Sequence, residues 1–339
     1  MDLDMHYYAT YLLSRSVGLS KDIALRVASA SQYTDDFVDP CWLRGDDGDI
    51  CVFPSAMRQD TEDPRIFDNI FTEIPFHFLP GGEGDSVEEK LVARRGGRGI
   101  QRMLEEVFAC RNTTYLPELM GIAAHALMDS YAHWGFSGMR GPWNAIAKES
   151  IRTDGVCAGA GKEECGKVRS GIASLFFPAA PKDASGPTGN GHDDAGMLPD
   201  LPYVRWRCVM RGDDMVRDNT DLYLQACHAL HEALCRFKVL WRSSGNMTAF
   251  VNLREPLCEL LSVREFSGTC RAQFWSQLYE ELFPGETIPE YAEQKAALDG
   301  REAAFGNFSR GVTYFRTMVL GSVLPSLGIV LLPSRSVMP

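Results

Sequence analysis

The sequence has no continuous apolar run as long as the ~18 residues that a membrane-spanning helix needs. The nearest run, 318–332, is interrupted by Gly321, Pro325 and Gly328. We interpret it as a buried C-terminal segment, with a peripheral membrane contact as the less favoured alternative. The sequence therefore predicts a protein without a transmembrane segment.

The N-terminal residues also lack the pattern of a secretory signal peptide. The chain starts with Met1-Asp-Leu-Asp, which puts acids where a signal peptide carries basic residues. The ten cysteines are therefore expected to stay reduced and to serve mostly as small core residues. Together these features predict a cytoplasmic protein.

Positive charge is scarce, because 34 Lys and Arg residues stand against 45 Asp and Glu residues and the formal net charge is −11. A tight, non-specific grip on a nucleic-acid backbone needs clustered basic residues, so long nucleic acid is a disfavoured partner. A metal site that meets phosphates locally is still compatible with this charge. A small or lipid phosphodiester fits the acidic balance better.

Internal repeats and convincing runs of alternating strand residues are also missing, whereas helical periodicity recurs along the chain. The sequence predicts an all-α, multi-helix bundle. We expect a helical metal-binding domain over 1–250, with a Gly-rich insertion at 153–205. A helical extension over 251–339 is expected to pack on the same core.

The most informative stretch runs from Gly121 to Gly138. As a helix it places His125, Asp129 and His133 four residues apart on one stripe, surrounded by apolar and small residues. A carboxylate buried in this way needs a partner, and His and Asp are ligands that zinc and similar metals take. The alternative is a His–Asp–His hydrogen-bond ladder inside a helical core.

Other segments add polar groups that could join this stripe. Asp35 and Asp36 end a helix that begins after Ser20, where the macrodipole disfavours acids. They either meet a cation or form a turn. His77 lies between two aromatics in an extended apolar stretch, where a packed core histidine is the ordinary interpretation and metal ligation the alternative.

Two later candidates compete. His192 lies among glycines and acids in a loop that leads to a Pro-Asp-Leu-Pro turn at 199–202, as expected for a site loop. His228 and Glu232 share one face of a helix at a spacing that suits metal ligation. An ordinary surface pair explains them equally well.

Taken in order, these residues resemble the zinc-dependent phospholipase C and fungal single-strand nuclease superfamily. The resemblance rests on His6, on Asp35 in Tyr-Thr-Asp-Asp, on His77 in Phe-His-Phe, and on the helix with His125, Asp129 and His133. It extends from the N-terminus to about the helix that holds His228. The chain looks closer still to a bacterial family of unknown function whose members open with Asp-x-His-Tyr-Tyr.

The resemblance implies an all-α fold with up to three zinc ions. Asp35, His77, His125 and Asp129 would hold the first ion. His6 and Asp129 would serve the second, which a mature N-terminal residue completes in the superfamily; here we expect Asp4 in that role. His133 would hold the third with either His192 or the pair His228 and Glu232, and we favour His192 because glycines let a loop approach a metal.

The third histidine of the superfamily helix comes two residues later than His133, so one to three ions are possible. The sequence predicts a metal-dependent phosphodiester hydrolase in which Asp35 or Asp36 orients or deprotonates the attacking water. The alternative is a non-catalytic helical binding protein that the metal only stabilises.

Overall fold

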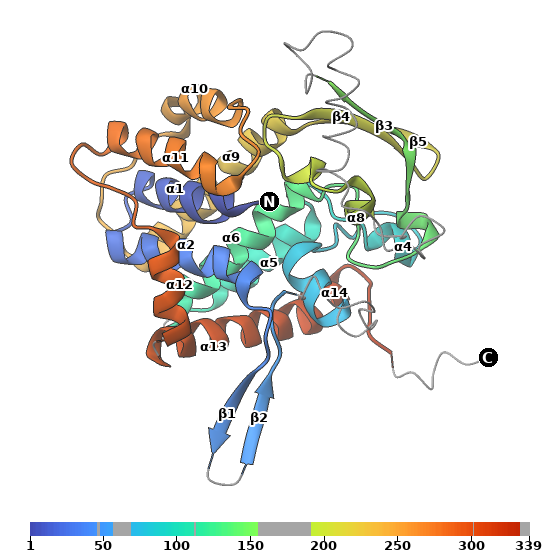
Figure 1. Ribbon diagram of the computed structural model, residues 1–339. Helices are drawn as coiled ribbons and strands as arrows, with labels where there is room; N and C mark the ends of the chain where they lie inside the picture. The colour runs from blue at the N-terminus through green and yellow to red at the C-terminus, as the bar shows by residue number, and fades with distance from the viewer. Residues whose placement is uncertain (46–47, 57–68, 112, 155–190, 301, 333–339) are drawn as a thin grey trace.

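The computed structural model describes residues 1–45, 48–56, 69–111, 113–154, 191–300 and 302–332 (Figure 1). Most of them are helical. The α-helices are α1 (Thr10–Ser16), α2 (Lys21–Asp36), α4 (Val87–Lys90), α5 (Arg98–Ala109), α6 (Leu116–Ala132), α8 (Gly191–Ala195), α9 (Asn219–Trp241), α10 (Phe250–Leu261), α11 (Gly268–Leu282), α12 (Tyr291–Gly300), α13 (Glu302–Met318) and α14 (Leu324–Ser326). Shorter 3-10 turns are η3 (Pro142–Asn144) and η4 (Leu198–Asp200), and π-helical segments are η1 (Asp4–Ala9), η2 (Asn69–His77) and η5 (Val319–Val323).

Helix α6 lies at the centre of the helical body, between α2, α9 and α13 (Figure 1). Every residue of α6 is buried. The residues of this helix are apolar or small on nearly all sides. Exposure of any face to water would raise the free energy of the folded protein, so the helix is buried. The expected central helix is therefore present, although it ends at Ala132, earlier than the stretch to Gly138 that the sequence indicated.

Helix α2 packs unusually close to α6. Ser20 caps its start by accepting a hydrogen bond from the backbone N–H of Ile23. At Gly121 of α6, a Cβ atom would lie 2.3 Å from the carbonyl oxygen of Val27, so only glycine fits at this crossing. The close approach brings the C-terminal end of α2 against the polar stripe of α6.

The C-terminal helices share one hydrophobic core with the N-terminal ones. Leu257 of α10, Trp275 of α11 and Phe308 of α13 belong to the same buried cluster as Leu12 of α1 and Leu127 of α6. The apolar run near the C-terminus is partly covered, since Val319, Val323 and Leu324 are buried. Within the described ranges, no helix combines the length and apolarity needed to cross a membrane.

The helical prediction holds for most of the described residues, and a small antiparallel sheet adds to the helices. Strands β3 (Ile146–Asp154), β4 (Arg205–Met210) and β5 (Asp213–Asp218) pair in the order β3-β4-β5. Strand β4 alternates exposed and buried residues, and the turn at Arg211 and Gly212 takes positive φ at both positions, as tight hairpins do. These strands flank the expected insertion at 153–205, of which 155–190 lie outside the described residues.

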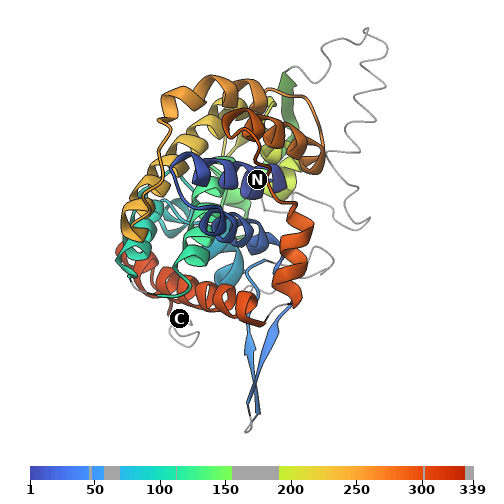
Figure 2. The same cartoon turned by 90° about the vertical axis from the view of Figure 1, so that its left-hand side faces the viewer.

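A second pair of strands follows α2 in the chain. Strands β1 (Cys41–Gly45) and β2 (Gly48–Val52) form an antiparallel hairpin after α2. The hairpin projects away from the helical body in both views (Figures 1 and 2). Along the chain the hairpin lies between α2 and η2, the two elements that bring Asp35 and His77 to α6.

Candidate metal centre

Helix α6 supplies three polar side chains to one buried site. His125 and Asp129 lie within the helix, and His133 is the first residue after it. The backbone N–H of His133 still bonds to the carbonyl oxygen of Asp129 at 2.7 Å, so His133 stays on the same stripe. All three side chains are buried, with Asp129 only 1% exposed.

Two π-helical segments carry further histidines to this stripe. η1 holds His6, and η2 ends at His77. In η2, Pro75 has no N–H to give, and the N–H of Phe78 bonds to the carbonyl oxygen of Glu73 five residues back. The segment 74–80 was expected to be extended; the wide helical turn instead aims His77 at α6.

Four side chains converge into a first group. His77 Nδ1 lies 3.0 Å from His125 Nε2. Asp129 Oδ2 is 3.4 Å from His77 Nδ1 and 3.1 Å from His125 Nε2. Asp35 Oδ1 is 3.6 Å from His77 Nδ1 and 3.5 Å from His125 Nε2. Ligand atoms about 2.0–2.1 Å from a tetrahedral zinc ion lie about 3.4 Å apart, so these spacings match the edges of such a site.

Backbone carbonyls set the direction of each histidine in the first group. His125 Nδ1 lies 2.9 Å from the carbonyl oxygen of Ser31, and His77 Nε2 lies 3.1 Å from that of Ser55. A carbonyl can only accept, so each of these nitrogens carries the proton and the other nitrogen of the ring offers its lone pair. Metal-binding histidines are usually oriented in this way.

A second group forms around the other oxygen of Asp129. His6 Nε2 lies 3.2 Å from Asp129 Oδ1 and 3.8 Å from Asp35 Oδ2, so both carboxylates face two groups. The Met1 amino group lies 2.7 Å from Asp129 Oδ1. Among the described residues, neither ring nitrogen of the fully buried His6 has a hydrogen bond of acceptable geometry. An unsatisfied buried imidazole fits a place that a metal ion would fill.

A third group lies at the end of α6. His133 Nε2 is 3.8 Å from Asp200 Oδ1, and His192 Nε2 is 3.2 Å from Asp200 Oδ2. The Nδ1 atom of His133 donates to the carbonyl oxygen of His77 at 2.9 Å, so its Nε2 atom presents a lone pair on the side of Asp200. Three sets of ligand atoms within these groups lie close enough together to hold a metal ion: Asp35, His77 and His125; His6, His125 and Asp129; and His133, His192 and Asp200.

Asp200 was not among the predicted ligands. It belongs to the Pro-Asp-Leu-Pro turn that the sequence suggested as an anchor for the His192 loop, and η4 places its carboxylate between the two histidines. The signal in the sequence was the Pro-Asp pair itself, eight positions after a Gly-His. Its role could not be predicted from residue spacing, because a short 3-10 turn has no helical periodicity that would place Asp200 on the same face as another ligand.

Several predicted residues lie elsewhere. Asp4 does not complete the second group, because its carboxylate pairs with Arg271 at 2.9 Å and faces Trp275. The amino group of Met1 lies where Asp4 was expected. Asp36 belongs to none of the candidate ligand sets and accepts a hydrogen bond from the Tyr291 hydroxyl at 2.7 Å.

His228 and Glu232 do not meet His133. They face each other at 3.8 Å on the surface of α9, with side chains 54% and 69% exposed. They form the ordinary surface pair that was the alternative interpretation. His192, from the short helix α8, takes the place beside His133.

Comparison with known proteins gives one match. A family model described as a family of unknown function, DUF6765, matches residues 1–317. The chain belongs to this family. Neither the curated proteins nor the solved structures contain a significant match.

Asp129 is the main negative charge of the metal centre. Burial by itself would raise the pKa of the Asp129 carboxyl, but the Met1 amino group and nearby histidines hold it well below its usual range. Burial opposes protonation of His77, yet Asp129, Glu73 and Asp35 raise the pKa of His77 to about 9. Burial lowers the pKa of His133 to about 4. In the metal-free protein the buried Asp129 carboxylate therefore lies next to two cationic groups, the Met1 amino group and His77, whereas burial favours the neutral form of His133.

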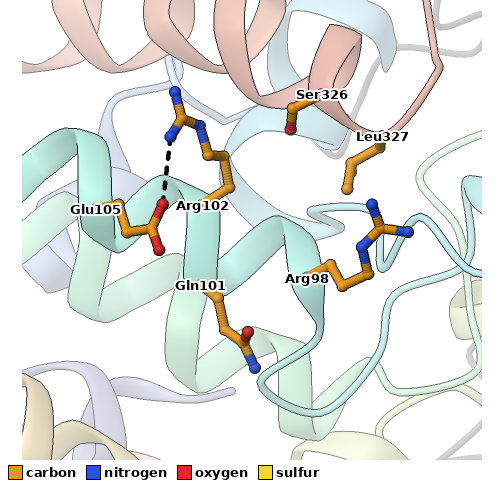
Figure 3. Close-up of a pocket in the computed structure, with 6 residues that line it drawn as sticks. All are labelled: Arg98, Gln101, Arg102, Glu105, Ser326 and Leu327. Atoms are coloured by element: carbon orange, nitrogen blue, oxygen red, sulfur yellow. Dashed lines mark hydrogen bonds and ion pairs between the residues drawn. The ribbon is translucent and has the colours of Figure 1, made fainter.

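The centre is open on the side of Asp35 and Asp200. The side chains of Asp35, Asp200 and His192 are 32%, 20% and 22% exposed, whereas those of His6 and His125 are fully buried. Solvent, and any substrate, would therefore reach the first and third groups. A surface pocket lies elsewhere, between α5 and α14, and is lined by Arg98, Gln101, Arg102, Glu105, Ser326 and Leu327 (Figure 3).

Arg217 of β5 fixes the end of α6. Its guanidinium is almost completely buried and donates to the carbonyl oxygens of Tyr131, Ala132 and Trp134. Tyr131 and Ala132 belong to the last turn of α6, where carbonyls have no intrahelical partners. Arg217 therefore holds the backbone on both sides of His133, and sequence analysis gave no sign of this role.

Proposed function

We propose that this protein is a metal-dependent hydrolase of phosphodiesters, with zinc as the metal. The observation that carries the proposal is the first group. Donor atoms of Asp35, His77 and His125 lie 3.0–3.6 Å apart, and Asp129 adds an oxygen 3.1 Å from His125 Nε2 and 3.4 Å from His77 Nδ1. Imidazole nitrogens and carboxylate oxygens are donors that zinc prefers. The resemblance to the zinc-dependent phospholipase C and nuclease superfamily supports the same reading.

The two carboxylates make a multinuclear site possible. Asp35 and Asp129 each present one oxygen to the first group and the other to His6. Bound divalent ions in such a site would supply an activated water and neutralise charge on the phosphoryl oxygens. This arrangement supports hydrolysis of a diester better than a single closed site would.

Asp35 is the residue of this chain best placed to handle a proton. It is a member of the first group and is also the most exposed of the centre's ligands. In the metal-free protein, loss of solvation inside the site and the neighbouring Asp129 carboxylate raise the pKa of the Asp35 carboxyl above its usual value. Asp36, the other predicted catalytic residue, is held by Tyr291. We therefore assign the role of orienting or deprotonating water to Asp35 alone.

The substrate we propose is a small or lipid phosphodiester. The net charge of −11 disfavours a long polyanion. The opening beside Asp35 and Asp200 is itself lined by carboxylates, so several adjacent phosphates would be repelled. A single phosphodiester that meets the metal locally avoids most of that repulsion.

The proposal is tested with purified protein of measured metal content. The substrates are bis(p-nitrophenyl) phosphate, a short-chain phosphatidylcholine, a dinucleotide and single-stranded DNA. We expect hydrolysis of one of the first three, loss of it with a chelator and recovery with zinc. The variant Asp35→Asn should lose turnover, while His228→Ala should retain it. Metal-loaded protein that cleaves none of the four would overturn the proposal.

A structural role for the metal is the second candidate. Its support is the burial of the second group, in which His6 and Asp129 are at most 1% exposed and leave little room for substrate. Closed sites of this kind fasten helices together. Under this alternative, metal removal lowers the melting temperature and the loaded protein shows no activity on any diester.

A further inference from the structure

A separate cluster of soft donor atoms lies on α9 and the segment after it. Cys235 Sγ is 3.7 Å from His231 Nδ1, one helical turn earlier. The same sulfur is 3.4 Å from Met247 Sδ. The cluster thus joins an imidazole, a thiol and a thioether, whereas the metal centre is built from His and Asp side chains. None of the three residues takes part in the proposed hydrolysis.

The imidazole of this cluster is already oriented. His231 Nε2 lies 2.9 Å from the carbonyl oxygen of Thr248, so Nε2 carries the proton and Nδ1 presents its lone pair to Cys235. The His231 side chain is 5% exposed, and the ring of Phe250 packs beside it with centroids 5.6 Å apart. The orientation of the ring is therefore fixed. Metal-binding histidines are commonly oriented in the same way, by a hydrogen bond to a backbone carbonyl.

The methionine is exposed, yet its backbone is tied down. Met247 is 54% exposed, so burial of an apolar side chain is not what determines its position. The neighbouring Thr248 donates its N–H to the carbonyl oxygen of Ser16 at 2.7 Å, and Ser243 donates its hydroxyl to that of Gly18 at 2.7 Å. These bonds anchor the segment on both sides of Met247 and hold the thioether over Cys235.

We propose that His231, Cys235 and Met247 form a binding site for Cu(I). Thiolate and thioether sulfur select soft ions, and an imidazole completes a three-coordinate set. Donors about 2.3 Å from one ion at trigonal angles lie about 4 Å apart, close to the two separations observed. Cys235 binds as the thiolate, so its proton passes to solvent as the ion enters. The exposed side of Met247 leaves the ion a path from solvent.

The site is tested by anaerobic titration of the full-length protein with Cu(I) in competition with a chromophoric chelator. We expect one tightly held equivalent, lost in Cys235→Ser and weakened in Met247→Leu. The loss in Met247→Leu should be at least about tenfold, because even the loss of a group that only orients a ligand weakens metal binding by about 10–100-fold. X-ray absorption at the copper edge should show sulfur and nitrogen neighbours. Zinc content should be the same in all variants.

The matched control is Cys270→Ser, which removes an exposed thiol of α11. This variant should bind Cu(I) as the wild type does. Circular dichroism and melting of each copper-free variant establish that the fold is kept. Equal copper affinity in Cys235→Ser and wild type would overturn the proposal, and so would an unchanged affinity in Met247→Leu. Because the readout is copper affinity, its failure is distinct from failure of the hydrolase proposal.

Discussion

His77 Nδ1 and His125 Nε2 lie 3.0 Å apart in the core, although the other nitrogen of each ring faces a backbone carbonyl. If both rings are neutral, two lone pairs of buried side chains point at each other. Either an added proton or a metal cation must lie between them, since unsatisfied buried polar atoms are costly. The surrounding carboxylates of Asp35 and Asp129 favour a cation, and this relationship underlies the predictions that follow.

Removal of metal should destabilise the protein. An ion that binds only the folded state adds about 4 kcal/mol at a thousand times its dissociation constant. We therefore expect a chelator to lower the melting temperature by several degrees and zinc to restore it. Asp129→Asn should lose metal and show little response to the chelator. The surface variant His228→Ala should behave as the wild type; unchanged metal content in Asp129→Asn would refute the assignment.

The two histidines with the largest pKa shifts should make the metal-free protein most stable near pH 6.5. The pKa of His133 is lowered to about 4 in the folded state, so the unfolded chain binds more protons below its ordinary value of 6.5. Stability therefore falls with decreasing pH from 6.5 to 4, with a slope of up to ~1.4 kcal/mol per pH unit. Chemical denaturation of His133→Asn over this range should give a shallower slope.

The alkaline limb comes from His77. Its pKa is raised to about 9, so its contribution to stability is full below pH 6.5 and disappears as the pH rises through 9. We expect His77→Asn to remove this alkaline loss in denaturation curves of metal-free protein. A wild-type stability that stays level from pH 7 to pH 10 would contradict the prediction.

Gly121→Ala should disturb the metal centre from a distance. The new Cβ atom would lie 2.3 Å from the carbonyl oxygen of Val27, so α2 must move away from α6 and take Asp35 with it. Overpacking of this kind costs about 1–3 kcal/mol. Zinc affinity should fall together with stability. The matched control is Gly306→Ala in α13, where an added Cβ meets nothing within 4 Å and stability should hold or rise.

Arg217→Gln should weaken the third group selectively. The variant leaves carbonyls at the end of α6 without their donors, and His133 loses the backbone support on both sides. We expect the zinc content to drop by one ion, with the remaining sites still loaded. Arg217→Lys, which keeps the charge and part of the hydrogen bonding, should restore some of it. Full zinc content in Arg217→Gln would show that Arg217 supports only the fold.

The local sequence carried much of the helical organisation. The burial of helix α6 follows from its apolar and small residues, which favour the interior of the protein. The placement of His125 and Asp129 on one side of the helix follows from helical geometry. The cap at Ser20 likewise sets where α2 begins. Periodicity is a short-range property, so these features were predictable from neighbouring residues.

The tertiary structure alone decided which distant groups meet. Asp4 and His6 are two residues apart, yet Arg271 from α11 draws Asp4 away while His6 faces Asp129. Asp200 and Arg217 act through contacts with α6 that span many residues of chain, and neither lies on a helical stripe. His228 has ligand spacing but sits on a solvent-facing side of α9. Spacing states which side chains share a face, whereas packing between elements determines which face is buried and what it meets.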